Sequence, residues 1–344
     1  AARVAYLKVA RRFPGTSYSS RAGVQAALIL YLRGNARNAA SEFTALAERR
    51  GDRTESSAAT YWSGRALQTA GDSAGARARW RTVIEHFPLS YYAVPAAERL
   101  GVSAIAVTAE SLPPPDPEAA AALQRGALLD RLGLRVEARF EYDRVSRLAE
   151  AAPATLGATA AALSASGHTA RAYRLATRSG AGALQRLLFP LPRPNDLPEE
   201  AREANVDPLL AAALIRQESG FDPGARSAAD ARGLMQVLPG VGAALARADG
   251  LREWDSALLY EPEVNLRFGL RHLAEALRRF PHLEPALAGY NAGTRAAERW
   301  LTLPGAKQDP EVYIERIQFV ETRDYVRRIL RNLAVYRALY PGTP

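Results

Sequence analysis

The sequence has 344 residues, of which 48% are hydrophobic and 24% charged, a balance that excludes a disordered chain and a length that predicts two domains. It has no cysteine, which excludes disulfides, thiolate nucleophiles and Cys-ligated metals, and no apolar run long enough to span a bilayer. The formal charge of +9 suits binding to an anionic polymer, although an arginine-rich composition explains the charge as well. The sequence has no basic run interleaved with aromatic residues, the pattern that would predict nucleic-acid binding.

Four glycines mark a repeat in the first half of the sequence. Each follows a helical pattern, an alanine stands five residues later, and a larger or apolar residue stands nine residues later. A glycine ends the first helix in the left-handed conformation, and the small alanine lets the second helix pack closely. The pattern predicts TPR-like helical hairpins of about 34 residues with one insertion. The members are Gly34 with Ala39 and Phe43, Gly71 with Ala76 and Trp80, Gly133 with Ala138 and Tyr142, and Gly167 with Ala172 and Ala176.

The sequence starts in the middle of such a repeat. Tyr6 and Phe13 have the spacing of Trp80 and Phe87, so residues 1–18 match the end of a unit and we expect further repeats upstream. No basic and apolar leader begins the sequence, so we expect any secretion signal to lie outside it.

Prolines divide the chain. Those between 113 and 117 predict an exposed connection inside the repeat region, because proline cannot continue a helix. A second group between 190 and 198 predicts a boundary. We therefore expect a curved superhelical repeat domain over 1–185, a linker over 186–199, and a second domain over 200–344.

The second domain opens with a helix that carries a candidate acid. Asp207 and Pro208 predict the helix start, and Gly220 predicts its end after Ser219. Glu218 shares the apolar side of this helix and lies at its negative end, and both conditions raise the pKa of a carboxyl group. A glutamate that stays protonated near neutral pH is suited to general acid catalysis. From this helix alone, a surface carboxylate is the alternative interpretation.

Further motifs follow Glu218 in order. They are Ser219-Gly220, Ser227, Gly233-Leu234-Met235-Gln236 with Pro239, Asn265 with Gly269 and Leu273, Ala288-Gly289-Tyr290-Asn291-Ala292-Gly293 with Trp300, and the segments 313–319 and 321–326. This succession resembles the catalytic domain of the soluble lytic transglycosylases, a goose-lysozyme-like helical fold. The stretches 61–67 and 87–93 resemble the helical superhelix of the same family. The predicted fold class is therefore all-α, with a repeat superhelix followed by a lysozyme-like domain.

The resemblance implies a substrate and a mechanism. The substrate would be the glycan strand of peptidoglycan, in the periplasm, with no cofactor and with Glu218 as the single acid. Glu218 would protonate the glycosidic oxygen between N-acetylmuramic acid and N-acetylglucosamine, and then take the proton of the muramic acid O6 hydroxyl. O6 would close on C1, giving a 1,6-anhydro end without water. The repeats would orient the strand or set the reach of the active site, and proteins of cell-wall synthesis or division are the other partners expected for them.

The resemblance also implies the residues of the site. Ser227, Gln236 and Tyr290 would hold the sugars, while Met235 and Leu238 would shape the wall of the groove. An ordinary half-buried core tyrosine is the alternative for Tyr290. Asn291 is expected to hold the loop that follows it. Glu315 is expected near Glu218 as a tuner of its acidity, and a salt bridge with an arginine is the alternative.

Two other functions are open at this point. A muramidase that uses water would normally have a second carboxylate across the bond, but the nearest in sequence, Asp222, precedes a proline and predicts a turn. A silent binding scaffold is the second alternative, and the intact Glu218, Gln236 and Tyr290 disfavour it. The four histidines lie far apart in sequence, so no metal site is predicted.

Three residues depart from the family pattern. Asp230 stands where glycine is usual, Thr294 stands where proline is frequent, and Gln318 replaces a proline between Ile317 and Phe319. These departures affect the expected geometry of loops and the placement of Glu315, and none of them touches Glu218.

Overall fold

The computed structural model describes residues 1–49, 53–107, 112–179, 185–193 and 196–343. Within those ranges every regular element is a helix, apart from two isolated bridges in the loop 226–237. The predicted all-α class is therefore confirmed. None of the described helices is both long and apolar enough to cross a membrane.

The chain forms two compact units that are interleaved in sequence. Unit 1 combines Ala1–Ala106 with His282–Ala334, and unit 2 combines Val107–Pro281 with the residues from Val335 onward. Each unit thus draws on both sides of residue 200, and the predicted domain limits at 185 and 200 stay a prediction.

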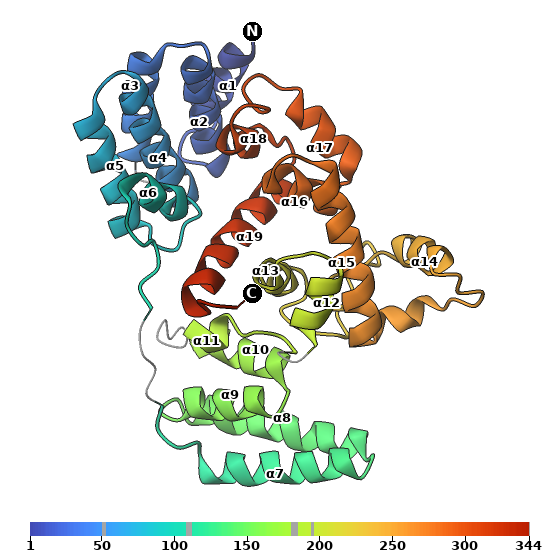
Figure 1. Ribbon diagram of the computed structural model, residues 1–344. Coiled ribbons are helices and arrows are strands. Elements are labelled where there is room, and N and C mark those ends of the chain that lie inside the picture. Colours follow the sequence, from blue (N-terminus) through green and yellow to red (C-terminus); the bar gives the residue numbers. More distant parts are fainter. Residues whose placement is uncertain (50–52, 108–111, 180–184, 194–195, 344) are drawn as a thin grey trace. The chain divides into compact units, whose positions relative to one another are not determined.

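The helices are labelled in Figure 1. Those of unit 1 are α1 (Ala2–Arg12), α2 (Ser17–Leu32), α3 (Ala36–Ala47), α4 (Arg53–Thr69), α5 (Ser73–His86), α6 (Ala93–Leu100), α16 (Leu283–Ala292), α17 (Thr294–Leu301), α18 (Pro310–Arg316) and most of α19 (Val320–Leu339). Those of unit 2 are α7 (Pro117–Arg131), α8 (Arg135–Ala151), α9 (Leu156–Ala165), α10 (Thr169–Ser179), α11 (Gln185–Leu188), α12 (Leu197–Glu203), α13 (Pro208–Glu218), α14 (Pro239–Ala248), the 3-10 helix η1 (Ser256–Tyr260) and α15 (Pro262–Arg279), followed by the end of α19.

The predicted hairpins are present: α2–α3 and α4–α5 in unit 1, and α7–α8 and α9–α10 in unit 2. Figure 1 shows α7 and α8 side by side. The four turn glycines have φ between 77° and 92°, a range in which a side chain is strained. The eight residues that follow them in the predicted frame are at most 4% exposed. The repeat prediction is therefore confirmed for these four hairpins.

Two hairpins contain a further glycine, seven residues before the turn. A Cβ atom at Gly64 would lie 2.5 Å from Nε1 of Trp80, and one at Gly126 would lie 2.6 Å from the ring of Tyr142. Trp80 and Tyr142 occupy the same position in the repeat. The aromatic side chain of the second helix therefore packs across the first helix where glycine leaves room.

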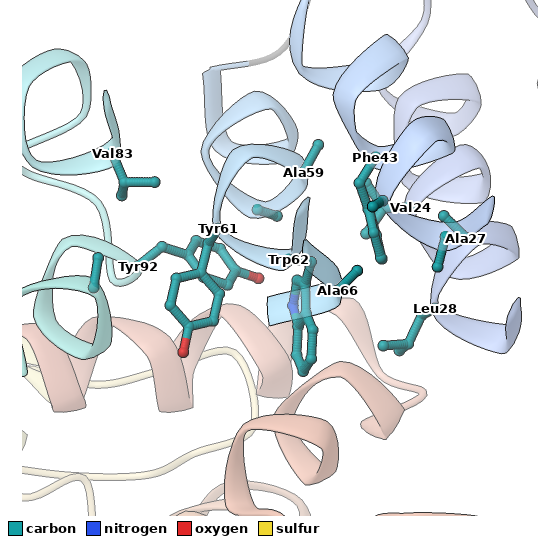
Figure 2. Packing of buried hydrophobic residues seen from close by; sticks show 14 of the residues in the cluster. Val24, Ala27, Leu28, Phe43, Ala59, Tyr61, Trp62, Ala66, Val83 and Tyr92 are labelled. Atoms are coloured by element: carbon teal, nitrogen blue, oxygen red, sulfur yellow. The ribbon is translucent and has the colours of Figure 1, made fainter. Parts of the chain in front are cut away.

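Trp62 lies in the hydrophobic core of unit 1, which Figure 2 shows from close by. Its ring stacks on Phe43 with centroids 6.5 Å apart and meets Tyr61 edge to face at 5.8 Å. Burial of such rings is a large stabilising contribution, and aromatic pairs add about 0.5–1.5 kcal/mol beyond it.

The ends of α1 and α5 are alike, as the sequence predicts. Phe13 and Phe87 have φ of −126° and −131°, and each donates its N–H to the carbonyl four residues earlier.

The described part of the proline-rich connection, 112–116, is not helical, and Asp116 caps α7 by accepting the N–H of Ala119 at 2.9 Å. Residues 108–111 lie outside the described residues. Of the second proline group, Pro198 lies at the start of α12.

Candidate active site

Glu218 is the last residue of α13 in unit 2. Asp207 starts this helix as predicted, because its carboxylate accepts the N–H of Leu209 at 2.8 Å. The helix is buried as far as Ile215, and Glu218 is half-buried. The helix ends one residue earlier than predicted, since Ser219 has left helical geometry with φ −123°.

Aromatic and cationic side chains hold the last turn of α13 from within unit 2. Nε of Arg216 donates to the carbonyl of Leu188 at 2.7 Å, and its guanidinium lies 4.1 Å from the ring centre of Phe189 and 5.3 Å from that of Tyr173. Burial lowers the pKa of Arg216. Tyr173 also meets Phe221 edge to face at 5.2 Å, just after the turn. Helix α10 and the end of α11 therefore support the helix end that carries Glu218.

One buried side chain organises the loop between α13 and α14. Asn265 on α15 is fully buried, and its Oδ1 accepts the N–H of Met235 at 2.8 Å. Its Nδ2 donates to the carbonyls of Arg232 at 2.8 Å and Leu259 at 2.7 Å. Gly233 has φ +75°, and a Cβ atom there would overlap the carbonyl oxygen of Leu259. Asn265 and Gly233 thus fix the loop, a role that the sequence motif did not assign to them.

Two of the predicted sugar-binding residues also shape the loop. Nε2 of Gln236 donates to the carbonyls of Ala225 at 3.1 Å and Gly233 at 2.9 Å, so its amide nitrogen serves the loop and its amide oxygen keeps acceptor capacity. Ser227 is exposed, and its Oγ accepts the N–H of Ala231 at 3.0 Å. These hydrogen bonds hold the polar groups of both side chains in fixed positions.

The two predicted wall residues differ in exposure. Met235 is fully buried, and its Sδ packs so closely on Gly269 that a Cβ atom there would lie 2.5 Å from the sulfur. Met235 thus supports the loop from inside and offers no surface to a ligand in this structure. Leu238 is 44% exposed at the start of α14, so it can present an apolar surface.

Two carboxylates follow Glu218 closely in sequence, and both are engaged. Asp222 accepts the N–H of Gly224 at 2.9 Å and pairs with Arg174 at 3.2 Å, which confirms the predicted turn. Asp230 has φ +64°, the conformation that explains why glycine is usual at this position. Its carboxylate pairs with Arg232 at 3.0 Å and with Arg226 at 2.6 Å, and the hydrogen bonds from Arg232 hold its pKa below the usual value.

Tyr290 and Asn291 belong to unit 1, near the end of α16. Tyr290 is half-buried, and Asn291 is exposed. Oδ1 of Asn291 accepts the hydroxyl of Thr322 at 2.7 Å, which ties the end of α16 to α19.

Glu315 also lies in unit 1, where it is only 2% exposed. Nη2 of Arg327 donates to both of its carboxylate oxygens, at 2.8 and 2.7 Å, and the hydroxyl of Tyr92 donates as well. Burial acts to raise the pKa of Glu315, but Arg327 and Arg323 outweigh it and hold the pKa below its ordinary value. The side chain thus forms the salt bridge that the sequence offered as the alternative to a tuning role.

Residues 197–312 match the family model of the transglycosylase SLT domain. This part of the chain is therefore similar to SLT domains. It contains Glu218, the loop that follows it, and Tyr290 with Asn291. The resemblance to soluble lytic transglycosylases that the motifs predicted is therefore confirmed.

Proteins with known sequences or structures show the same resemblance. The soluble lytic murein transglycosylase of Salmonella typhimurium is 32% identical over 151 residues, which cover 43% of this chain and 23% of that protein. The structure of an inactive Glu-to-Gln mutant of the lytic transglycosylase Slt from Pseudomonas aeruginosa matches with a TM-score of 0.72 and 25% identity, covering 98% of this chain and 54% of that one. The 70 kDa soluble lytic transglycosylase of Escherichia coli matches in fold with a TM-score of 0.63 and 20% identity, over 99% of this chain and 66% of that one. The chain thus spans about half to two thirds of these solved structures.

Proposed function

We propose that the protein is a lytic transglycosylase that cleaves the glycan strands of peptidoglycan in the periplasm, with Glu218 as its acid. The observation that carries the proposal is the match of residues 197–312 to the SLT domain model, within which Glu218 ends a buried helix. One relative is a murein transglycosylase and another is inactive as a Glu-to-Gln mutant, which supports the same activity and the need for a glutamate.

The chemistry follows from one carboxyl group that changes its protonation state. Protonated Glu218 gives its proton to the glycosidic oxygen as the bond from that oxygen to C1 of N-acetylmuramic acid breaks. The carboxylate then takes the proton of the O6 hydroxyl, and O6 forms the new bond to C1. The proton returns to Glu218, no water is consumed, and the products are a free 4-hydroxyl and a 1,6-anhydro end.

The engagement of the neighbouring carboxylates favours this single-acid mechanism over hydrolysis. A hydrolase would use a second carboxylate as a nucleophile or as a base for water. Asp222 and Asp230 are each paired with arginine and bound into turns, so neither is free for that role. Hydrolysis by a muramidase is the second candidate, and the products distinguish the two.

The loop after Glu218 would form one side of the sugar-binding groove. Ser227 and the amide oxygen of Gln236 would accept or donate hydrogen bonds to N-acetyl sugars, and Leu238 would supply an apolar contact. Met235 would act by supporting the loop. Tyr290 stays a proposed sugar-binding residue because of its place in the sequence motif.

Mass spectrometry of peptidoglycan sacculi digested with the protein tests the proposal. We expect muropeptides one water lighter than the products of hydrolysis, and a rate about 100–10,000-fold lower for Glu218→Gln, which removes a general acid. Glu263→Gln is the matched control, because this side chain is 79% exposed on α15 and should leave the rate unchanged.

Three other outcomes of this experiment would contradict the proposal in different ways. Products with reducing ends would replace the proposal by a muramidase. Full activity of Glu218→Gln would remove Glu218 as the acid, and no release by the unchanged protein would contradict the enzymatic function.

A further inference from the structure

Three consecutive backbone carbonyls in unit 2, those of residues 188–190, each accept a hydrogen bond from a different side chain. The donors are Nε of Arg216 at 2.7 Å, the hydroxyl of Tyr340 at 2.9 Å and the hydroxyl of Tyr336 at 2.8 Å, in that order along the segment. The last two carbonyls belong to no helix, so they need partners from elsewhere in the fold. Arg216 comes from α13, and the two tyrosines come from the end of α19 that belongs to unit 2. The segment 188–190 therefore joins the C-terminal helix to the helix that carries Glu218.

Ring contacts reinforce these hydrogen bonds. The guanidinium of Arg216 lies 4.1 Å from the ring centre of Phe189, and the same ring meets Tyr336 edge to face at 5.7 Å. Tyr336 in turn stacks on Tyr340 with ring centres 6.0 Å apart. A cation over an aromatic ring is attracted by the negative face of the ring, most strongly where water is excluded. Arg216 is thus held in one orientation by both its Nε–H group and its planar face.

A second ring fixes the chain just after Glu218. The ring centre of Tyr173 on α10 lies 5.3 Å from the guanidinium of Arg216, and the ring meets Phe221 edge to face at 5.2 Å. A Cβ atom at Gly220 would lie 3.0 Å from this ring. Gly220 and Phe221 have φ of +57° and +69°, and a positive φ is strained for a bulky residue such as phenylalanine. Strained backbone persists only where its surroundings hold it, and the ring of Tyr173 supplies that support.

The charge of Arg216 has a cost in stability. Burial lowers the pKa of Arg216, because its surroundings disfavour the charged form. An apolar side chain of similar volume would avoid that cost. What the guanidinium offers instead is fixed geometry, since it combines hydrogen-bond donors and a flat face in one rigid group.

We infer that Arg216 and Tyr173 are positioning residues for Glu218. They fix residues 216, 220 and 221 on both sides of it in the chain, and so hold the end of α13 and its carboxyl group in one place. A proton is transferred over a short hydrogen bond, and a displacement of about 1 Å is enough to slow such a step about 100-fold. The inference rests on the proposed role of Glu218 as the acid. It gives the segment 188–190, which the sequence predicts as part of a linker, a role in the activity.

Two measurements on the purified 344-residue chain test the inference. Hydrogen exchange followed by mass spectrometry measures how firmly residues 217–222 are held, and initial rates on isolated glycan strands give kcat and KM. In R216M and in Y173L we expect exchange at 217–222 to become about fivefold faster or more, because the support of the turn is lost. We expect kcat of both to fall about 10–100-fold, with KM changed by less than about threefold. Y173F keeps the ring, so its kcat should stay within about threefold of the unchanged value.

Two controls separate positioning from a general loss of stability. L163A truncates a fully buried leucine in the core of the repeat hairpins of unit 2. It should lower the melting temperature while leaving exchange at 217–222 and kcat unchanged, both measured well below that temperature. R178M changes an exposed arginine on the helix that carries Tyr173, and should alter neither measurement. Should R216M fail to fold in circular dichroism, Y173L decides the outcome.

Unchanged exchange or unchanged kcat in both R216M and Y173L would overturn the inference, and so would a rise in KM with kcat intact. Equal losses in L163A would also overturn it, because the effect would then be one of stability alone. With an active unchanged chain, these outcomes reject the inference and leave the proposed function standing. An unchanged chain that cleaves nothing rejects the proposed function, and the exchange rates then still decide whether Arg216 and Tyr173 hold the end of α13.

Discussion

At the scale of single residues, the local part of the site could be predicted and the distant part could not. The start of α13 and the position of Glu218 at its end follow from Asp207, Pro208 and Gly220, which act on their own neighbours in sequence. Asn265 acts on Met235, which is 30 residues away, and no local pattern shows such a bond. The burial of Met235 and the identity of the arginine that pairs with Glu315 could not be predicted for the same reason.

The loop after Glu218 depends on Gly233, and Gly240 offers a matched comparison. Gly233→Ala should destabilise the protein by more than about 2 kcal/mol, because φ is positive and the added methyl would overlap the carbonyl of Leu259. Gly240→Ala should change stability by less than about 1 kcal/mol, since nothing lies within 4 Å of the added atom. Urea denaturation measures both. Equal stability of the two variants would show that Gly233 does not fix the loop.

At the scale of elements, the repeat frame was predictable because its signals are periodic. The turn glycines have the required positive φ, and the alanines and larger residues that follow them are buried. The glycines at 64 and 126 were not recognised, since a sequence does not show which side chain packs across which helix. The spacing of seven residues before the turn could have revealed them.

The contact between Gly64 and Trp80 can be tested by a double-mutant cycle. Gly64→Ala should destabilise the protein by about 1–3 kcal/mol, because its methyl would collide with the indole. Trp80→Phe makes room, so Gly64→Ala should cost less in that background, with a coupling of about 0.5–3 kcal/mol. Thermal unfolding of the four proteins gives the coupling, and purely additive effects would exclude a direct contact.

At the scale of the whole molecule, residues far apart in sequence meet inside unit 1. The carboxylate of Glu315 joins Arg327 on α19 and Tyr92 beside α6, so the repeat helices and the C-terminal helices share one buried charged cluster. Arg65 extends the connection, since it pairs with Asp309 at 2.6 Å and with Glu311. The early part of the chain is therefore needed to complete the packing of α18 and α19.

The pair of Glu315 and Arg327 should respond differently to single and double substitution. Arg327→Leu should cost about 3–5 kcal/mol, because it leaves the carboxylate of Glu315 buried without its cation. Glu315→Leu combined with Arg327→Leu should cost less than Arg327→Leu alone, because no unpaired charge remains. Guanidinium denaturation measures both. A double variant that is less stable than the single one would show that the cluster contributes more than charge compensation.

The same cluster should set the response of unit 1 to acid. The pKa of Glu315 is held below the ordinary value of 4.5, so its contribution to stability is full above that value and is lost as pH falls through the lowered pKa. The raised pKa of Glu55 acts in the opposite sense, because the folded state holds its proton more firmly, and stability from this group is lost as pH rises above 4.5. From pH 7 to pH 3, the melting temperature of the variant with both Glu315→Leu and Arg327→Leu should therefore fall less than that of the unchanged protein. In Glu55→Gln, by contrast, the stability lost above pH 4.5 should be recovered. An unchanged pH profile in both variants would show that neither carboxyl group is linked to folding.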